Sequence, residues 1–340
     1  MRDFLSPAVD LNGHSILVTG GTGSFGRKFI TTVLERYKPA RLIVYSRDEL
    51  KQFEMAQELS PNTYSCLRYF IGDVRDKDRL ETAMRGIDTV VHAAALKHVP
   101  IAEYNPFECI ATNVHGAENV VNASIRSGVK RVVALSTDKA ANPINLYGAS
   151  KLASDKIFVA ANHLAGAGGC RFAVVRYGNV IGSRGSVIPF FQKLIKQGAT
   201  ELPITDQRMT RFLITLQQGV NFVLSSMAMM RGGEIFVPKI PSMKMTDLAT
   251  AIAPQLPQKV VGIRPGEKLH EVMITEEDSW STFELEDRYV IEPSHIRWET
   301  DRSDLPGAKR VTEGFYYNSR DNSAWMTGAQ LQALLATEQS

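Results

Sequence analysis

The chain contains 340 residues, of which 44% are hydrophobic and 22% are charged, and its formal net charge at pH 7 is +3. These values are typical of a globular protein with a large core, and the lack of a basic block argues against nucleic acid as a partner. Three cysteines without metal-ligand spacing, an N-terminus without a signal pattern and the lack of a membrane-length apolar run predict a cytoplasmic protein with no metal site and no membrane contact.

The first predicted strand, residues 15–19, leads into a glycine-rich loop. Its sequence SILVT is apolar, GGTGSFG follows, and residues 27–37 then have helical spacing. Glycine lets the backbone turn tightly and lets a pyrophosphate approach the N–H groups at the start of a helix. The motif therefore predicts a dinucleotide site formed by Gly20, Thr22, Gly23, Ser24, Phe25 and Gly26.

The second predicted strand, residues 41–45, ends beside residues that give conflicting signals about the cofactor. Asp48 is suited to the ribose 2′-hydroxyl of NAD, whereas Arg47 with Ser46 is suited to the 2′-phosphate of NADP. Because a guanidinium beside a hydroxyl makes a good phosphate clamp, we favour NADP and include Lys51 in this part of the site. The alternative is that these residues are only a charged, solvated end of the strand and do not bind a cofactor.

Two further strands, beginning near residues 68 and 88, end at the same edge. The residues expected to contact the cofactor there are Asp73, Val74, Ala93, Ala94 and Ala95. The three alanines are small enough to let the backbone approach a cofactor closely. Lys97 follows them and can face an anionic substrate, while His92 and His98 have no metal-spaced partners and are interpreted as structural.

The stretch 136–151 is the centre of the predicted chemistry. An apolar strand over 130–136 ends at Thr137, and a helix beginning at Tyr147 places Lys151 four residues later on the same face. A nearby ammonium lowers the pKa of a tyrosine, so Tyr147 is expected to take a proton from a substrate alcohol while its carbon gives a hydride to a nicotinamide. Thr137 can hydrogen-bond the same oxygen.

Asp138 and Lys139 extend this chemistry beyond that of a simple dehydrogenase. Once a sugar carries a ketone at C4, the hydrogen at C5 becomes acidic. Neutral Lys139 can remove that proton while protonated Asp138 gives a proton to the leaving hydroxyl at C6. The alternative is that Asp138 and Lys139 form a solvated ion pair in a loop. Their position directly after the strand argues against this alternative.

Later segments add candidate substrate ligands. The strand over 171–182 ends at Asn179 and Val180, and Arg184 follows in a Gly/Ser-rich turn. Arg264 and Glu267 are expected in a loop before a helix, where they can bind a diphosphate and a ribose hydroxyl or simply form a surface turn. The chain after about residue 280 is expected to be irregular and to wrap the second lobe.

The order of these elements predicts an α/β fold with a doubly wound, parallel Rossmann sheet. We assign residues 13–185 to the dinucleotide-binding domain, with its sheet completed near 233–240. Residues 186–340 are expected to form a smaller, mainly C-terminal lobe that binds the substrate.

The chain resembles a known enzyme family over residues 13–274. The likeness is carried by TGGTGSFG, YSRDELKQ, IGDVRD, HAAALKHVPIAEYNP, STDKAANPINLYGASK, VRYGNVIGSRGSVIPFF, ITDQRMTRF, FVPKIPSMKMTDLA and IRPGEKLHEVMI. Together these sequences resemble the inverting UDP-N-acetylglucosamine 4,6-dehydratases (5-epimerising), which are extended short-chain dehydrogenase/reductase enzymes.

The resemblance implies a role for each matched residue. It makes Lys139 the C5 base and Asp138 the acid at C6, with Tyr147 and Lys151 oxidising C4 by means of a tightly bound, recycled NADP. The residues expected to contact the UDP-sugar are Lys97, Asn179, Arg184, Arg264 and Glu267. A homo-oligomer, an L-arabino 4-keto product and a place at the start of pseudaminic acid or related surface-sugar biosynthesis are also implied.

Three alternatives remain open at this point. A UDP-sugar 4-epimerase shares the Tyr/Lys pair but has no C5 proton to remove, so Asp138 and Lys139 argue against it. A retaining 4,6-dehydratase is similar but typically has Asp-Glu at these two positions. A redox sensor or scaffold that binds NADP without turnover would not need the whole set of reactive side chains.

Overall fold

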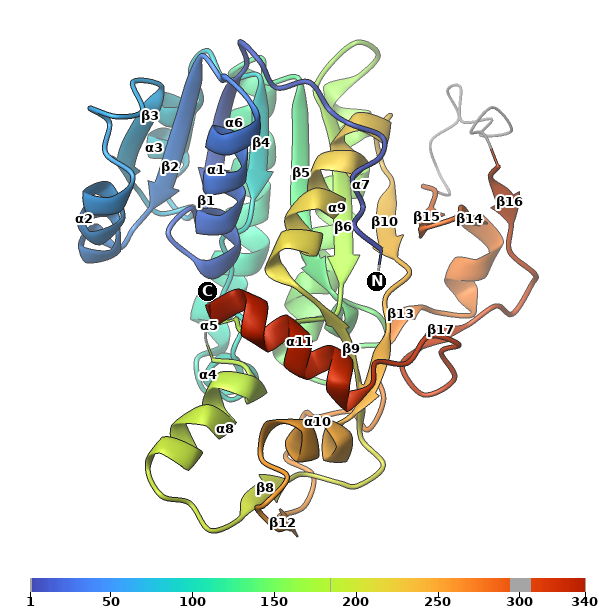
Figure 1. Cartoon of the computed structure of the whole chain (residues 1–340). Coiled ribbons are helices and arrows are strands. Elements are labelled where there is room, and N and C mark those ends of the chain that lie inside the picture. Colours follow the sequence, from blue (N-terminus) through green and yellow to red (C-terminus); the bar gives the residue numbers. More distant parts are fainter. Residues whose placement is uncertain (1, 184, 294–306, 340) are drawn as a thin grey trace.

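A mainly parallel sheet forms the centre of the protein in the computed structural model (Figure 1), which describes residues 2–183, 185–293 and 307–339. Within these residues the sheet has ten strands in the order β16-β14-β15-β10-β6-β5-β4-β1-β2-β3. The strands are β1 (Ser15–Thr19), β2 (Arg41–Ser46), β3 (Leu67–Ile71), β4 (Thr89–His92), β5 (Arg131–Thr137), β6 (Arg171–Tyr177), β10 (Ile235–Pro238), β14 (Thr282–Glu284), β15 (Arg288–Ile291) and β16 (Lys309–Arg310).

Apolar runs explain why the central strands lie in this layer. The middle residues of β1, β2 and β4 are buried, as expected for parallel strands covered on both faces. β1 pairs in parallel with β2 on one side and with β4 on the other, so the strand order reverses at β1. A crevice for a ligand forms at such a reversal. The predicted doubly wound α/β fold is confirmed.

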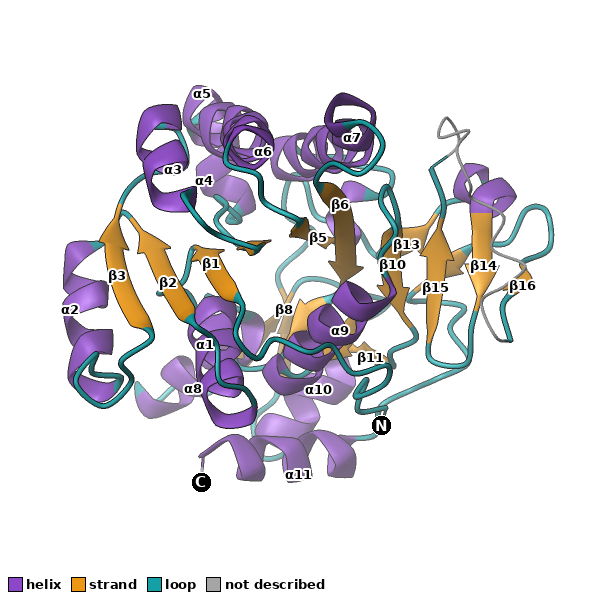
Figure 2. Cartoon of the chain, turned by 90° about the horizontal axis from the view of Figure 1, so that it is seen from above, coloured by secondary structure: helices purple, strands orange, loops and turns teal. Residues whose placement is uncertain are grey.

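Helices cover both faces of the sheet (Figure 2). One face carries α3 (Lys77–Met84), α4 (Val99–Tyr104), α5 (Pro106–Ile110), the π-helix η1 (Ala111–His115), α6 (Gly116–Arg126) and α7 (Leu146–Ala165). The other face carries α1 (Ser24–Arg36), α2 (Glu49–Glu58) and α9 (Leu216–Met229). Among the described residues, no helix combines the length and the apolar character needed to cross a bilayer.

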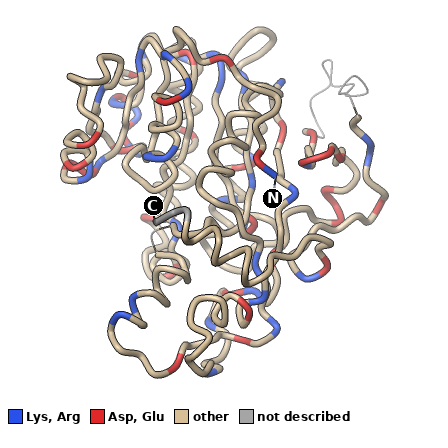
Figure 3. The backbone as a smooth tube through the Cα atoms, in the orientation of Figure 1, with Lys and Arg blue, Asp and Glu red and all other residues tan. Residues whose placement is uncertain are grey.

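A second lobe lies below the large sheet in Figure 1. It contains α8 (Val187–Lys196), β8 (Leu202–Ile204), β11 (Ser242–Lys244), α10 (Met245–Ile252), β12 (Gln258–Val260) and α11 (Gly328–Gln339). β9 (Thr210–Ile214) connects the two parts, because its alternating side chains face different cores: Phe212 packs in the large core and Leu213 in the small one. Basic and acidic residues are interspersed over both parts (Figure 3).

Two sequence expectations about the C-terminal part are wrong. The chain after about residue 280 is not irregular, because β14 and β15 pair with each other and β15 pairs with β10, all antiparallel. The loop that carries Arg264 and Glu267 leads into a strand, β13 (Val272–Ile274), which pairs with β17 (Tyr317–Asn318), and not into a helix. Apolar runs of three or four residues do not distinguish strand from helix by periodicity.

The contact between β1 and α1 depends on glycine at residue 26. A methyl group there would lie 2.5 Å from Gly20 O and 2.6 Å from Gly21 Cα. We therefore expect Gly26→Ala to lower the free energy of unfolding by about 1–3 kcal/mol, because backbone atoms would have to move. Urea denaturation measures this change.

Gly219 in α9 provides the matched control. No described atom lies within 4 Å of a Cβ added to this residue. Gly219→Ala should therefore stabilise the protein by about 0.5–1 kcal/mol through the helix propensity of alanine. An unfolding midpoint for Gly26→Ala equal to that of the wild type would contradict the packing argument.

Candidate active site

The loop after β1 forms a cradle against the loop after β4. Gly20 has a φ of +66°, and a Cβ on it would lie 2.8 Å from the backbone nitrogen of Ala94. Gly23 is the N-cap residue of α1, where the described residues provide no side-chain cap and no acidic side chain in the first turn. The N-terminus of α1 thus keeps its positive end for an anion. These features fit the pyrophosphate of a dinucleotide.

The residues at the end of β2 and just after it have two different roles: Asp48 and Lys51 interact at the start of α2, whereas Ser46 and Arg47 line a cavity. The Asp48 carboxylate caps α2, accepting a hydrogen bond from the backbone N–H of Lys51 at 3.0 Å and pairing with the Lys51 side chain. Thr22 Oγ1 lies 2.8 Å from Ser46 Oγ, so these hydroxyls support each other. Arg47 lines the cavity, and its side chain is 54% exposed. Its NH1 lies 3.4 Å from Asp73 Oδ2, so the guanidinium faces this end of the site as the partner of another lining residue, and the Asp48 carboxylate is engaged elsewhere.

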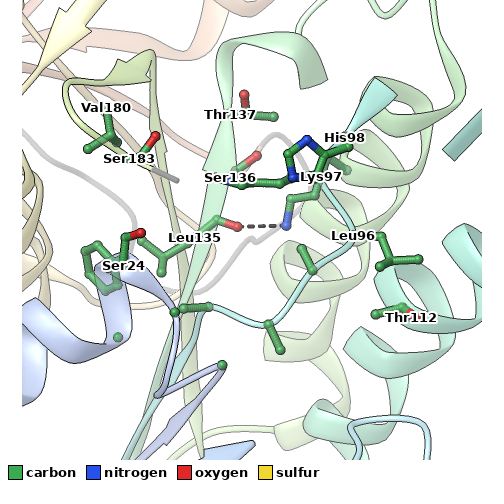
Figure 4. A pocket seen from close by; sticks show the side chains of 18 of the residues that line it. Ser24, Leu96, Lys97, His98, Thr112, Leu135, Ser136, Thr137, Val180 and Ser183 are labelled. Carbon is green, nitrogen blue, oxygen red and sulfur yellow. Dashed lines mark hydrogen bonds between the residues drawn. The ribbon is translucent and has the colours of Figure 1, made fainter. Parts of the chain in front are cut away.

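A cavity of about 590 Å³ collects most of the residues predicted from the sequence. Figure 4 shows Ser24, Lys97, Thr137 and Val180 around this space. The predicted residues that line it are Gly20, Gly23, Ser24, Phe25, Gly26, Ser46, Arg47, Asp73, Val74, Ala93, Ala94, Ala95, Lys97, Thr137, Lys139, Tyr147, Lys151, Asn179 and Val180. Thr22, Asp48, Lys51 and Asp138 are not among the residues that line it.

Lys151 is held by the strand beside its helix. Its Nζ donates a hydrogen bond to the carbonyl oxygen of Leu135, at 2.7 Å. Burial lowers the pKa of Lys151, and the Asp155 carboxylate opposes this shift. Asp155 in turn accepts a hydrogen bond from Ser136 at 2.8 Å and pairs with Arg176 at 3.3 Å, all within the core. The hydrogen bond to Leu135 therefore orients the lysine, and the buried network places a carboxylate charge near it.

Tyr147 lies at the start of α7 with 8% of its surface exposed. Burial raises its pKa to about 12, while the charge of Lys139 and a hydrogen bond with Thr137 act in the opposite direction. In the described structure the charge of Lys139 lowers the pKa of the phenol, and the Lys151 amine donates to the Leu135 carbonyl. The expected effect of Lys151 on Tyr147 stays a prediction.

Lys139, whose side chain is 24% exposed, lies at the centre of a charged cluster with two buried carboxylates. Its Nζ is 3.0 Å from Asp138 Oδ1, 3.2 Å from Glu271 Oε1 and 3.5 Å from Asn179 Oδ1. The Thr137 hydroxyl donates to Asp138 Oδ1 at 2.9 Å. Asp138 is fully buried, and its Oδ2 has no hydrogen-bond partner among the described residues. The structure thus brings Thr137, Asp138 and Lys139 together and adds Glu271.

Burial and neighbouring charges both shift the pKa values of Asp138 and Lys139. Burial raises the pKa of Asp138, an effect that the nearby Glu271 carboxylate adds to and the Lys139 ammonium opposes. Burial alone would lower the pKa of Lys139, but the two carboxylates raise it. The mechanism expected from the sequence requires a lowered pKa for this lysine, so the direction found here is opposite.

A second cavity of about 670 Å³ adjoins the first and shares Lys139, Asn179 and His98 with it. Arg264 and Glu267 line this second cavity, with 3.9 Å between Arg264 NH1 and Glu267 Oε1. Phe190 and Phe191 form an apolar part of its wall. His98, interpreted from the sequence as structural, lines both cavities. Arg184 lies outside the described residues.

Sequence reasoning missed two charged residues of this site, Arg211 and Glu271. Both line the second cavity, and their side chains pair at 3.6 Å between Arg211 Nε and Glu271 Oε1. Glu271 comes four positions after Glu267 in the same charged stretch, but a single glutamate there has no pattern that separates it from a surface residue. Among the described residues, no group of three or more His, Cys, Asp or Glu side chains is placed to hold a metal ion.

Comparison with other proteins gives the chain a family. Residues 16–293 match the family described as polysaccharide biosynthesis protein. The chain is 60% identical over 326 residues to the UDP-N-acetylglucosamine 4,6-dehydratase (inverting) of Campylobacter jejuni subsp. jejuni serotype O:23/36 (strain 81-176), which covers 94% of this chain and 96% of that protein. It is 42% identical over 311 residues to the UDP-glucose 4-epimerase of Rickettsia canadensis (strain McKiel), covering 88% and 87%.

Solved structures agree with this assignment. Pen from Bacillus thuringiensis superposes with a TM-score of 0.87 at 36% identity, covering 97% of this chain and 99% of Pen. DesIV, the dTDP-glucose 4,6-dehydratase of Streptomyces venezuelae solved with NAD and TYD bound, gives a TM-score of 0.66 at 26% identity, covering 75% and 86%. The chain therefore belongs to the polysaccharide biosynthesis protein family and, within it, to the dehydratase enzymes of the short-chain dehydrogenase/reductase type.

Proposed function

We propose that this chain is an NADP-dependent UDP-N-acetylglucosamine 4,6-dehydratase that inverts the configuration at C5. The observation that carries the proposal is the buried Asp138–Lys139 pair, which lies beside Tyr147 where the two cavities meet. The 60% identity to a relative named for this reaction supports the substrate and the stereochemistry.

The first step oxidises C4 of the sugar. Tyr147, as phenolate, takes the proton of the C4 hydroxyl, and the hydrogen bond with Thr137 stabilises that phenolate. Lys151, anchored on Leu135, lies on the same helix and lines the same cavity. A bound NADP would accept the hydride of C4 and later return the same hydride to C6.

The second step eliminates water across C5 and C6. The 4-ketone acidifies the C5 hydrogen, and neutral Lys139 takes that proton. The electron pair of the C5–H bond becomes the C5–C6 double bond as the C6–O bond breaks, and Asp138 gives its proton to the leaving hydroxyl. The raised pKa of the buried Asp138 suits this acid role. Addition of the hydride to C6 and of a proton to C5 then gives the 4-keto-6-deoxy sugar.

Arg47 supports NADP as the cofactor. Its guanidinium lines the cavity beside Ser46, whereas the Asp48 carboxylate is engaged as a helix cap with Lys51. A 2′-phosphate meets positive charge there, and the ribose of NAD lacks a free carboxylate partner at Asp48. Because the hydride returns to the product, we infer that the cofactor stays bound and is recycled. The product would enter pseudaminic acid or related surface-sugar biosynthesis.

Turnover in deuterated water tests the proposed reaction. The purified protein, without added cofactor, should convert UDP-N-acetylglucosamine to a 4-keto-6-deoxy sugar with deuterium at C5 and L-arabino configuration, as read by NMR. Deuterium at C5 with retained configuration would overturn the inversion. Formation of the C4 epimer without deuterium would identify a 4-epimerase, the activity named for the Rickettsia relative.

Substitution of Arg47 tests the choice of cofactor. Hydrogen bonds to a charged group contribute about 1.5–3 kcal/mol, so Arg47→Ala should reduce the preference for NADP over NAD by about 10–150-fold. Binding of both cofactors by the stripped enzyme measures this preference. Asp48→Asn is the control, because asparagine also caps helices and only the carboxylate charge is lost. A gain in NADP preference in Asp48→Asn, with no loss of preference in Arg47→Ala, would reverse the assignment.

A further inference from the structure

Glu271 is a buried carboxylate for which the proposed reaction has no role. It lies directly before β13, and its side chain is 2% exposed. Its backbone N–H donates to Ser319 Oγ at 2.9 Å, and its carbonyl accepts from the Ser319 N–H at 2.8 Å. Because Ser319 binds both the N–H and the carbonyl of Glu271, the backbone that carries the Glu271 side chain is fixed. It extends to Lys139.

The acceptors around Lys139 match the donors of an ammonium group. A lysine ammonium has three N–H donors, and the neutral amine has two donors and one lone pair. Asp138, Glu271 and Asn179 place one oxygen each at 3.0, 3.2 and 3.5 Å from Nζ. Asp138 precedes Lys139 in the chain, whereas Asn179 and Glu271 come from distant segments, so the tertiary structure supplies two of the three acceptors of the charged form.

Glu271 is the carboxylate of this cluster that keeps its negative charge. The charges of Lys139, Arg211 and Lys268 lower its pKa, although burial acts in the opposite direction. Arg211 is itself fixed, because its NH1 donates to the carbonyl oxygens of Thr210 and Leu269. Asp138 differs, since burial raises its pKa.

We propose that Glu271 is a positioning residue that orients the Lys139 amine in the active site and stabilises the positive charge that forms on it when it takes the substrate proton. This inference rests on the proposed function, in which Lys139 removes the C5 proton. A fixed negative charge 3.2 Å from Nζ strengthens the base in the transition state, because the ammonium is forming there. The same charge makes the neutral amine less abundant before the reaction.

The pH dependence of the reaction follows from these two effects. The titratable and charged groups that face Lys139 are Asp138, Glu271, Tyr147, Arg211 and Lys268. Lys139 acts only when neutral, so activity rises with pH as the amine loses its proton. Removing the charge of Glu271 lowers the pKa of Lys139. The rising limb of the pH–rate profile, which is the pH range over which activity increases, then moves to lower pH. The plateau rate of the profile falls because the base is weaker.

Glu271→Gln tests the proposal, because it removes the charge and keeps the shape. The rate of deuterium incorporation at C5 is measured against pH with UDP-N-acetylglucosamine. We expect the rising limb to move to lower pH by about one to three units, as for loss of an opposite charge at this distance, and the plateau to fall. Glu271→Asp, with its carboxylate withdrawn by one methylene, should shift the limb in the same direction by less.

Glu277→Gln is the matched control, since it removes an exposed carboxylate from the following segment and should leave the profile unchanged. A Glu271→Gln profile that falls in height but keeps its limb at the wild-type pH would overturn the proposal and leave Glu271 a structural residue.

Chemical labelling separates this inference from the proposed function. The rate at which an amine-selective acylating reagent modifies Lys139, followed by mass spectrometry against pH, reports the same titration without turnover. Labelling should begin at lower pH in Glu271→Gln than in the wild type, and an unchanged labelling profile would overturn the inference. If wild-type protein labels as expected but gives no C5 deuterium, the proposed function fails alone. Should Glu271→Gln not fold, the smaller labelling shift expected for Glu271→Asp decides the question.

Discussion

The pairing of Lys139 with Asp138 and Glu271 is the interaction on which the active site depends. Removing charged groups from water costs several kcal/mol per ion, and loss of one partner from a buried pair typically costs about 3–5 kcal/mol. Lys139 and Asp138 follow a strand of the large sheet, whereas Glu271 precedes a strand of a smaller one. The charges are therefore satisfied only when these parts of the chain meet. The two cavities lie at that junction and share the lysine between them.

A second buried network supports the other half of the chemistry. The Asp155–Arg176 pair with Ser136 connects β5, α7 and β6 behind Lys151, at a depth where 1% of Asp155 and 3% of Arg176 is exposed. This network lies between two strands of the large sheet and a helix that covers it, while the Lys139 cluster lies where the two cavities meet. Lys151 and Lys139 are thus held by different sets of contacts.

The pKa values of Asp138 and Glu271 are shifted in opposite directions, and this explains how two neighbouring carboxyl groups can take different roles. Asp138 and Glu271 are both buried beside the same lysine, yet burial dominates for the first and neighbouring cations dominate for the second. Arg211, which pairs with Glu271 at 3.6 Å, and Lys268 add to the effect of Lys139 on Glu271. One carboxyl group is thereby suited to hold a proton and the other to hold a charge. A pair of titratable groups whose environments separate their pKa values is characteristic of acid–base catalysis.

The sequence by itself determined the sheet, the glycine cradle and the reactive stretch around Thr137, because each depends on local spacing. Apolar runs predict strands, a glycine at residue 20 permits a positive φ, and a four-residue interval puts Tyr147 and Lys151 on one helical face. Only the tertiary structure decided that Asp48 caps a helix, that β14 and β15 extend the sheet, and that Arg211 and Glu271 reach Lys139. It also decided the direction of each pKa shift. Those properties follow from burial and from distances between residues far apart in the chain, which no local pattern encodes.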